Sequence, residues 1–250
     1  MSESNKRNFI VHGSILAIAG ILVRIIGMLY RIPVVNIIGS EGNGIYGAAF
    51  NIYNIMLVLS SYGLPMAVSK LVSARFTKKR YKSAAKVLRC SLMVAVCTGG
   101  IAALLVFFGA SFIENVIYGG GLPGLAVPLR ILAPTIFLVA ILGVIRGFFQ
   151  GQSTMIPTAV SQILEQIVNA IVSIAAGYGM MKAFASSPDV AAYGAAGSTL
   201  GTAMGALTAV LFMGFLYAVY TPTFNRLKRK DRHTENQSTG QICKIIIYTM

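Results

Sequence analysis

Residues 9–38 read FIVHGSILAIAGILVRIIGMLYRIPVVNII, an apolar run that contains Arg24. The run is longer than the roughly 20 residues with which an α-helix crosses a hydrocarbon core. Steps of three and four residues place small and cationic side chains on one helical face: Gly13, Ala17, Gly20, Arg24, Gly27 and Arg31. A guanidinium keeps its charge in a protein and is costly at membrane depth, so it normally faces a polar cavity. The run therefore predicts a membrane-spanning helix whose Arg24 face lines such a cavity.

The two arginines lie at different depths if this helix enters the membrane near Phe9. At a rise of 1.5 Å per residue, Arg24 lies roughly 22 Å along the helix and Arg31 roughly 33 Å. Arg31 is then near the outer surface, where it either belongs to the site or extends to the interface as an anchor. Arg24 is too deep to reach the interface, and its alternative is a buried acidic partner such as Glu165.

Composition places the whole chain in the membrane. Its 250 residues are 56% hydrophobic and 11% charged, with a mean hydropathy of +0.73, which excludes a soluble globular protein. The three cysteines are too few and too scattered for a disulfide framework or a metal site. Motifs for phosphate binding, zinc proteases and the nucleophile elbow are missing from the sequence. We therefore expect no enzymatic activity, no cofactor and no metal.

Six apolar segments are long enough to span a membrane and predict an all-α, polytopic protein. They lie near residues 9–38, 45–72, 91–113, 125–149, 156–181 and 191–220. A seventh segment begins at Ile242, and Met250 follows too soon for it to span. We expect a six-helix transmembrane lobe at residues 1–232, then a linker and the truncated start of helix seven at residues 233–250. On this interpretation the chain is the amino-terminal portion of a longer transporter that lacks its carboxy-terminal lobe.

Basic residues gather in alternate connectors and account for the net charge of +14. On one side they are Lys6, Arg7, Arg75, Lys78, Lys79, Arg80, Lys82, Lys86, Arg89, Arg146, Arg226, Lys228, Arg229, Lys230 and Arg232. The opposite connectors hold Lys182 beside Glu41, Glu114 and Asp189. Short basic loops stay in the cytoplasm, so we expect a multi-pass cell-membrane protein with a cytoplasmic amino terminus. These loops should contact anionic lipids, and their few aromatic residues argue against a nucleic acid partner.

The segment at residues 156–181 has a polar face through its middle. The residues of that face are Thr158, Gln162, Glu165, Gln166, Asn169 and Ser173. Such a face cannot meet lipid, so it either lines a hydrated cavity or forms hydrogen bonds across a tight helix interface. The many large amides favour the cavity. Glu165 could take a proton, hold a cation or neutralise Arg24, and the sequence does not choose among these.

Two other segments have distinctive patterns. The second presents a mostly polar face: Tyr46, Phe50, Tyr53, Asn54 and Ser61. That segment then reaches Gly63-Leu64-Pro65, where the missing amide hydrogen of proline must bend or break a helix. The sixth carries Gly197, Gly201 and Gly205 at four-residue spacing, which predicts a surface for close packing of a neighbouring helix.

Several motifs resemble the multidrug/oligosaccharidyl-lipid/polysaccharide flippase superfamily. They are VRIIGMLYRIP at residues 23–33, the segment from Gly39 to Tyr46, GLPMAVSK at residues 63–70, RGFFQG at residues 146–151, and MIPTAVSQ at residues 155–162 with Glu165 and Gln166. Together they are similar to the branch that contains the stage V sporulation protein B and its lipid II flippase relatives, and the resemblance covers essentially the whole chain.

That resemblance implies two six-helix lobes around a central cavity, in a transporter of polyprenyl-linked sugars whose cavity arginines bind the lipid's pyrophosphate. Arg24 matches the arginine of the first-helix motif, and Arg31 matches the second only with a displacement of one residue. A further cation expected late in helix two is replaced by apolar or small residues between Leu57 and Ser61.

We therefore expect a flippase that moves a polyprenyl-diphosphate-linked glycan, such as a peptidoglycan or related polysaccharide precursor, to the outer leaflet by alternating access. The candidate substrate-binding residues are Arg24, Arg31, Tyr53, Asn54, Gln162, Glu165, Gln166 and Asn169. One alternative is an ion-coupled multidrug exporter with Glu165 as coupling acid, which two deep cations disfavour because they repel cationic drugs. The other is a scaffold for cell-envelope synthesis that transports nothing.

Overall fold

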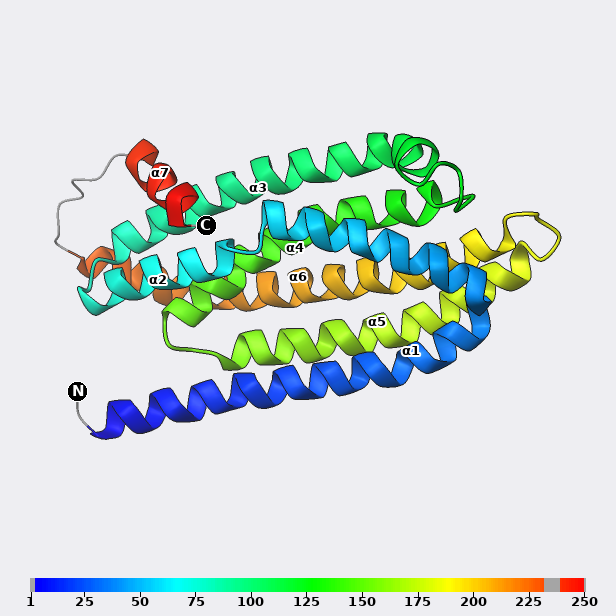
Figure 1. Cartoon of the computed structure of the whole chain (residues 1–250). Coiled ribbons are helices and arrows are strands. Elements are labelled where there is room, and N and C mark those ends of the chain that lie inside the picture. Colours follow the sequence, from blue (N-terminus) through cyan, green and yellow to red (C-terminus); the bar gives the residue numbers. More distant parts are fainter. Residues whose placement is uncertain (1–2, 232–238, 250) are drawn as a thin grey trace.

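The computed structural model describes residues 3–231 and 239–249, with side chains for residues 13–231 and 240–249. In these ranges all regular secondary structure is helical, which confirms the all-α class. The elements are α1 (Glu3–Ser60), α2 (Leu64–Thr77), α3 (Tyr81–Phe112), a π-helical turn (Ile113–Ile117), α4 (Ala126–Gly151), α5 (Ile156–Ala183), α6 (Val190–Lys230) and α7 (Thr239–Thr249). The long helices lie side by side in one bundle (Figure 1).

Helix α1 is two antiparallel arms joined at Gly39 (Figure 1). Gly39 has φ 70° and ψ −176°, a conformation that is open essentially to glycine alone. The chain therefore reverses at one residue, and no loop separates the first arm (residues 3–38) from the second arm (residues 40–60). Five helical segments of the described part are long and apolar enough to cross a membrane, and the first of them, Gly13–Thr77, contains this reversal. The sequence had indicated six separate spans.

The predicted break at Gly63-Leu64-Pro65 is present. The second arm ends at Ser60, and α2 begins at Leu64 with Pro65 in its first turn, where a proline costs no helical hydrogen bond. Backbone bonds from Tyr62 N to the Leu57 carbonyl and from Leu64 N to the Ser61 carbonyl close the turn between them. The predicted segment at residues 45–72 is thus two helical pieces.

Helices α5 and α6 approach closely along the predicted glycine surface, which confirms its packing role. A Cβ atom on Gly205 would lie 2.6 Å from the carbonyl oxygen of Glu165. Gly201 likewise lies against the backbone of Asn169 and Ser173, and Gly197 against the backbone of Ala176. This contact holds one side of α5 against α6, which leaves the other side of α5 toward the first arm of α1.

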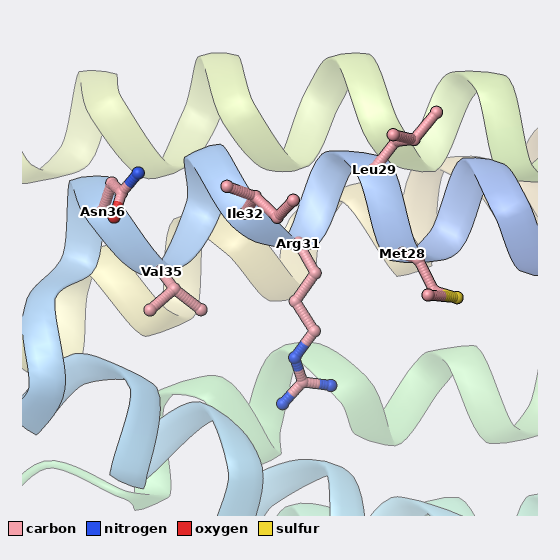
Figure 2. Close-up of a pocket in the computed structure, with 6 residues that line it drawn as sticks. All are labelled: Met28, Leu29, Arg31, Ile32, Val35 and Asn36. Carbon is pink, nitrogen blue, oxygen red and sulfur yellow. The ribbon is translucent and has the colours of Figure 1, made fainter.

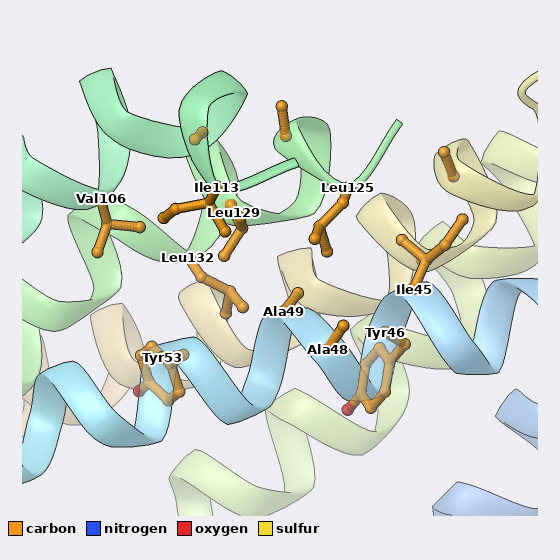
Figure 3. Packing of buried hydrophobic residues seen from close by; sticks show 14 of the residues in the cluster. Ile45, Tyr46, Ala48, Ala49, Tyr53, Val106, Ile113, Leu125, Leu129 and Leu132 are labelled. Atoms are coloured by element: carbon orange, nitrogen blue, oxygen red, sulfur yellow. The ribbon is translucent and has the colours of Figure 1, made fainter. Parts of the chain in front are cut away.

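The remaining core has two parts. One packs the second arm against α3 and the start of α4, and Figure 3 labels Tyr53, Leu129 and Leu132 among its buried residues. The other joins α2, α3, α4, α6 and α7, with Ile242 and Ile246 of α7 fully buried. At the same end Asp231, which follows α6, accepts a hydrogen bond of 2.9 Å from the backbone N–H of Lys82 in the first turn of α3.

Charge is segregated between the two ends of the bundle. The α2–α3 and α4–α5 turns and the end of α6 lie at the end that holds the amino terminus, whereas the reversal at Gly39 and the α5–α6 turn lie at the other (Figure 1). The basic cluster at residues 75–89 therefore shares one end with Lys228 to Lys230. That the basic end faces the cytoplasm stays a prediction. The division of the chain at residue 232 also stays a prediction, because residues 232–238 lie outside the described residues.

Candidate functional site

Four polar residues of α5 are packed inside the protein. Thr158, Ser161, Asn169 and Ser173 are each less than 10% exposed, and the hydroxyl of Ser161 donates to the Thr158 carbonyl at 2.8 Å. For Thr158, Asn169 and Ser173 of the predicted polar face, the structure shows the tight helix interface rather than the hydrated cavity, and Ser161 lies outside that predicted face. Gln162, Glu165 and Gln166 remain half-buried, so the accessible part of the polar face is narrower than its periodicity indicated.

Asn169 joins three helices. Its amide nitrogen donates to the Tyr30 hydroxyl of α1 at 3.3 Å, and its amide oxygen accepts from Thr202 of α6 at 3.4 Å. The Ser173 hydroxyl lies 2.9 Å from the same oxygen and 2.8 Å from the Ser198 carbonyl, and it can donate to only one of them at a time. The role of Asn169 in substrate binding stays a prediction, and these contacts place it between α1, α5 and α6.

Glu165 is ion-paired with Arg146 of α4. The carboxylate oxygen lies 2.7 Å from Nη2 of Arg146, and Nε of the same guanidinium donates to the Ser161 hydroxyl at 2.9 Å. The side chains are 14% exposed for Arg146 and 26% for Glu165. Two expectations change: Arg146 lies inside a helix rather than in a basic connector, and the acid pairs with it rather than with Arg24. A signal for this existed, because residue 146 falls within the predicted segment at residues 125–149.

Arg24 has an exposed side chain on the first arm of α1. Among the described side chains it has no hydrogen-bond or ion-pair partner. One turn further along, Gly27 lies against α5, where a Cβ atom would be 3.2 Å from Nε2 of Gln166. The predicted face of small residues therefore lets Gln166 approach α1 next to Arg24. A Cβ atom on Gly13 or Gly20, by contrast, would have no described neighbour within 4 Å.

Arg31 extends from the first arm across to the second. Its guanidinium carbon lies 5.6 Å from the ring centroid of Tyr46, within the range of a cation–π contact. Figure 2 shows this side chain leaving its helix toward the neighbouring helices. Beside it is an open groove of about 530 Å³ lined by Met28, Leu29, Arg31, Ile32, Val35 and Asn36. The contact directs Arg31 back over the protein rather than along the helix axis toward an interface.

A row of aromatic rings continues from Arg31 along the second arm. The ring centroids of Tyr46 and Phe50 are 4.5 Å apart, and those of Phe50 and Tyr53 are 5.7 Å apart. Tyr53, which is 6% exposed, lies within electrostatic range of Glu165. Figure 3 shows Tyr46 and Tyr53 on this arm. The row thus runs from Arg31 to the buried Tyr53, and Asn54 follows it with an exposed side chain.

The arrangement offers groups that can bind a polar ligand. Within the part of the chain described, no group of three or more His, Cys, Asp or Glu residues is placed to hold a metal ion. What the site offers is an unpaired guanidinium, a second one over an aromatic ring, and half-buried amides. These are donors for an anion and for hydroxyl-rich groups.

Comparison with known sequences gives a family match over most of the chain. Residues 10–240 match the family described as polysaccharide biosynthesis protein. The chain is 34% identical to the lipid II flippase MurJ of Bacillus subtilis (strain 168) over 176 residues, which are 68% of this chain and 32% of that protein. It is 30% identical to the stage V sporulation protein B of the same organism over 210 residues, 83% of this chain and 39% of that one. The chain thus spans well under half the length of these relatives.

One solved structure has the same fold. It is a transporter of the multidrug/oligosaccharidyl-lipid/polysaccharide superfamily from Pyrococcus furiosus Vc1 (DSM3638), described by the reverse polarity of its binding pocket. The TM-score is 0.70 at 16% sequence identity, and the match covers 94% of this chain and 51% of that one. The bundle of the present chain therefore corresponds to about half of that transporter.

Proposed function

Because the chain belongs to the polysaccharide biosynthesis protein family, in the branch of the flippase superfamily that contains MurJ and the stage V sporulation protein B, we propose that it is part of a lipid-linked glycan flippase. The transported molecule is a polyprenyl diphosphate that carries a glycan, of the peptidoglycan-precursor or a related polysaccharide type. It moves from the cytoplasmic to the outer leaflet by alternating access.

The observation that carries this proposal is the unpaired Arg24. The described acid at membrane depth, Glu165, is already neutralised by Arg146, so the guanidinium of Arg24 has no described counter-ion within the protein. A diphosphate would supply one, because its oxygens match the planar fork of a guanidinium and form charge-assisted hydrogen bonds. The exposed face of the first arm then lies toward the cavity that a second lobe would close.

The remaining residues fit the rest of such a substrate. Arg31 provides a second cation toward the reversal at Gly39, and the half-buried amides of Gln162 and Gln166 can bond sugar hydroxyls. The lipid tail stays in the bilayer. Rocking of the two lobes changes the side to which the headgroup is exposed, and the membrane potential can contribute because charge crosses the membrane.

The basic end of the bundle is proposed to contact anionic lipids of the cytoplasmic leaflet. Lys82, Lys228 and Arg229, with Asn225, line an open groove of about 540 Å³ there. Clustered cations next to a membrane surface attract acidic headgroups. This contact supports the orientation of the protein in the membrane and is separate from the Arg24 site.

Transport of labelled lipid II by the complete protein in liposomes tests the proposal. Arg24→Ala should abolish transport, and Arg24→Lys should retain a part of it, because an ammonium keeps the charge without the fork. A matched control replaces Lys78, Lys79 and Arg80 by Gln, which leaves the Arg24 site intact. Unimpaired transport by Arg24→Ala would contradict the proposal, and loss only in the control would favour the scaffold alternative.

A further inference from the structure

Arg146 is a further guanidinium within a helix long and apolar enough to span a membrane, and the proposed function does not use it. It lies five residues before the end of α4, which is about 7.5 Å from that helix end at 1.5 Å per residue. Two of its nitrogens are bound, Nη2 to Glu165 and Nε to Ser161. For Nη1 no described residue is a partner, so one edge of the guanidinium is available.

The contacts between α4 and α5 at this end depend on few side chains. Besides the bonds of Arg146, the described side-chain bond between the two helices is from Nε2 of Gln150 to the Thr158 hydroxyl at 3.5 Å, the limit for a hydrogen bond. Helix α5 is held from its other side by α6. The Arg146–Glu165 pair can therefore open without unpacking the buried face of α5.

A row of aromatic rings runs along the second arm. Its rings lead from Tyr53 through Phe50 and Tyr46 to Arg31. Arg31 is eight residues before the reversal at Gly39, about 12 Å from the far end of the first arm. Arg146 thus lies toward the basic end of the bundle and Arg31 toward the opposite end.

From this geometry we infer that Arg146 is an inner binding station for the diphosphate, and that Glu165 occupies it whenever no substrate is bound. The inference rests on the proposed function. A carboxylate and a phosphate offer a guanidinium the same pair of oxygen acceptors, so one can replace the other. The diphosphate carries more negative charge than the carboxylate, and it displaces Glu165.

The exchange leaves Arg146 with a counter-ion at both stages. Before binding, Glu165 neutralises Arg146, and after binding the diphosphate does so, which avoids a bare cation inside a membrane-spanning helix. When Glu165 returns to Arg146, it competes with the bound anion and releases it.

Binding of undecaprenyl diphosphate to the complete protein in lipid nanodiscs tests the inference. Glu165→Gln keeps the size of the side chain but removes the competing charge, and we expect about tenfold tighter binding, which corresponds to about 1.4 kcal/mol. In Glu165→Gln combined with Arg146→Gln, the gain should disappear. Thr158→Val removes the neighbouring bond between α4 and α5 without a change of charge, and its affinity should equal that of the wild type.

The outcomes separate this inference from the proposed function. If the wild type binds the lipid and Glu165→Gln binds it no more tightly, the inner station is wrong and the flippase proposal stands. If neither binds, both are wrong. If Glu165→Gln still binds the lipid more tightly when Arg146 is also replaced, the inference is wrong as well. Should Glu165→Gln not purify as a folded protein, Glu165→Asp serves instead, because its shorter carboxylate loosens the pair and should also tighten binding.

Discussion

The carboxylate of Glu165 lies 2.7 Å from a nitrogen of Arg146, which leaves Arg24 without a described acidic partner. This relationship divides the deep charges of the bundle into two kinds. The charge of one arginine, Arg146, is neutralised by a counter-ion on α5. The other, Arg24, has no counter-ion among the described residues, and the proposed function assigns that place to the diphosphate of the substrate.

The protein should be more stable with the Arg146–Glu165 pair intact than with only one of the two charges present. Removing one partner of a buried pair costs about 3–5 kcal/mol, and the partial exposure of Glu165 reduces this toward about 1–2 kcal/mol. We expect Arg146→Gln to lower the melting temperature in detergent. Adding Glu165→Gln should restore most of it, because no unpaired charge then remains. Additive losses in the double variant would show that the two side chains do not interact.

The contact of α5 with α6 should not tolerate a methyl group at Gly205. A Cβ atom would lie 2.6 Å from the Glu165 carbonyl oxygen, so Gly205→Ala should destabilise the protein by about 1–3 kcal/mol. Gly214→Ala, on the same helix, is the matched control because nothing lies within 4 Å of its added atom. Thermal unfolding followed by size-exclusion chromatography compares the two, and equal stability would refute the close approach.

The reversal of α1 should depend on Gly39. An alanine there must adopt a φ of 70° with ψ near 180°, which costs of order 1–3 kcal/mol or forces the arms apart. Gly39→Ala should therefore reduce the yield of folded protein. Gly47→Ala, in the middle of the second arm and free of close neighbours, should leave that yield unchanged. A folded yield of Gly39→Ala equal to that of Gly47→Ala would contradict the strained reversal.

The aromatic ring of Tyr46, rather than its hydroxyl, should support binding of the diphosphate lipid. Tyr46→Phe keeps the surface beneath Arg31, whereas Tyr46→Leu removes it along with the start of the aromatic row. An exposed cation–π contact contributes about 0.5–1 kcal/mol, so the leucine variant should bind the diphosphate lipid about two- to fivefold more weakly. The affinity of the phenylalanine variant should stay near that of the wild type. Equal losses in both would assign the effect to the hydroxyl.

The sequence predicted the helices and the break at Pro65 because apolar length and the missing proline amide act locally. It also predicted the glycine surface of α6, since small residues at four-residue spacing have few other uses in a membrane. The abrupt reversal at Gly39 was not predicted, because one backbone conformation replaced the loop expected between the first two spans.

Periodicity identified the polar residues of α5 as one face but could not say what covers that face. Helix α6 buries Asn169 and Ser173, and bonds to α4 engage Ser161 and Glu165. The partner of Glu165 depended on the tertiary arrangement, since Arg24 and Arg146 are both cations within apolar segments. Arg146 was assigned to a connector because it lies near a helix end, although its side chain turns back toward α5.

Water access at position 24 tests the central claim most directly. In a complete protein whose native cysteines are replaced, Arg24→Cys should react with a membrane-impermeant thiol reagent, and undecaprenyl diphosphate should protect it. Ile25→Cys, the next residue and rotated to another face, should not react. If Arg24→Cys stays unlabelled while a cysteine in a basic connector reacts, position 24 faces lipid or packed protein and the proposed site is wrong.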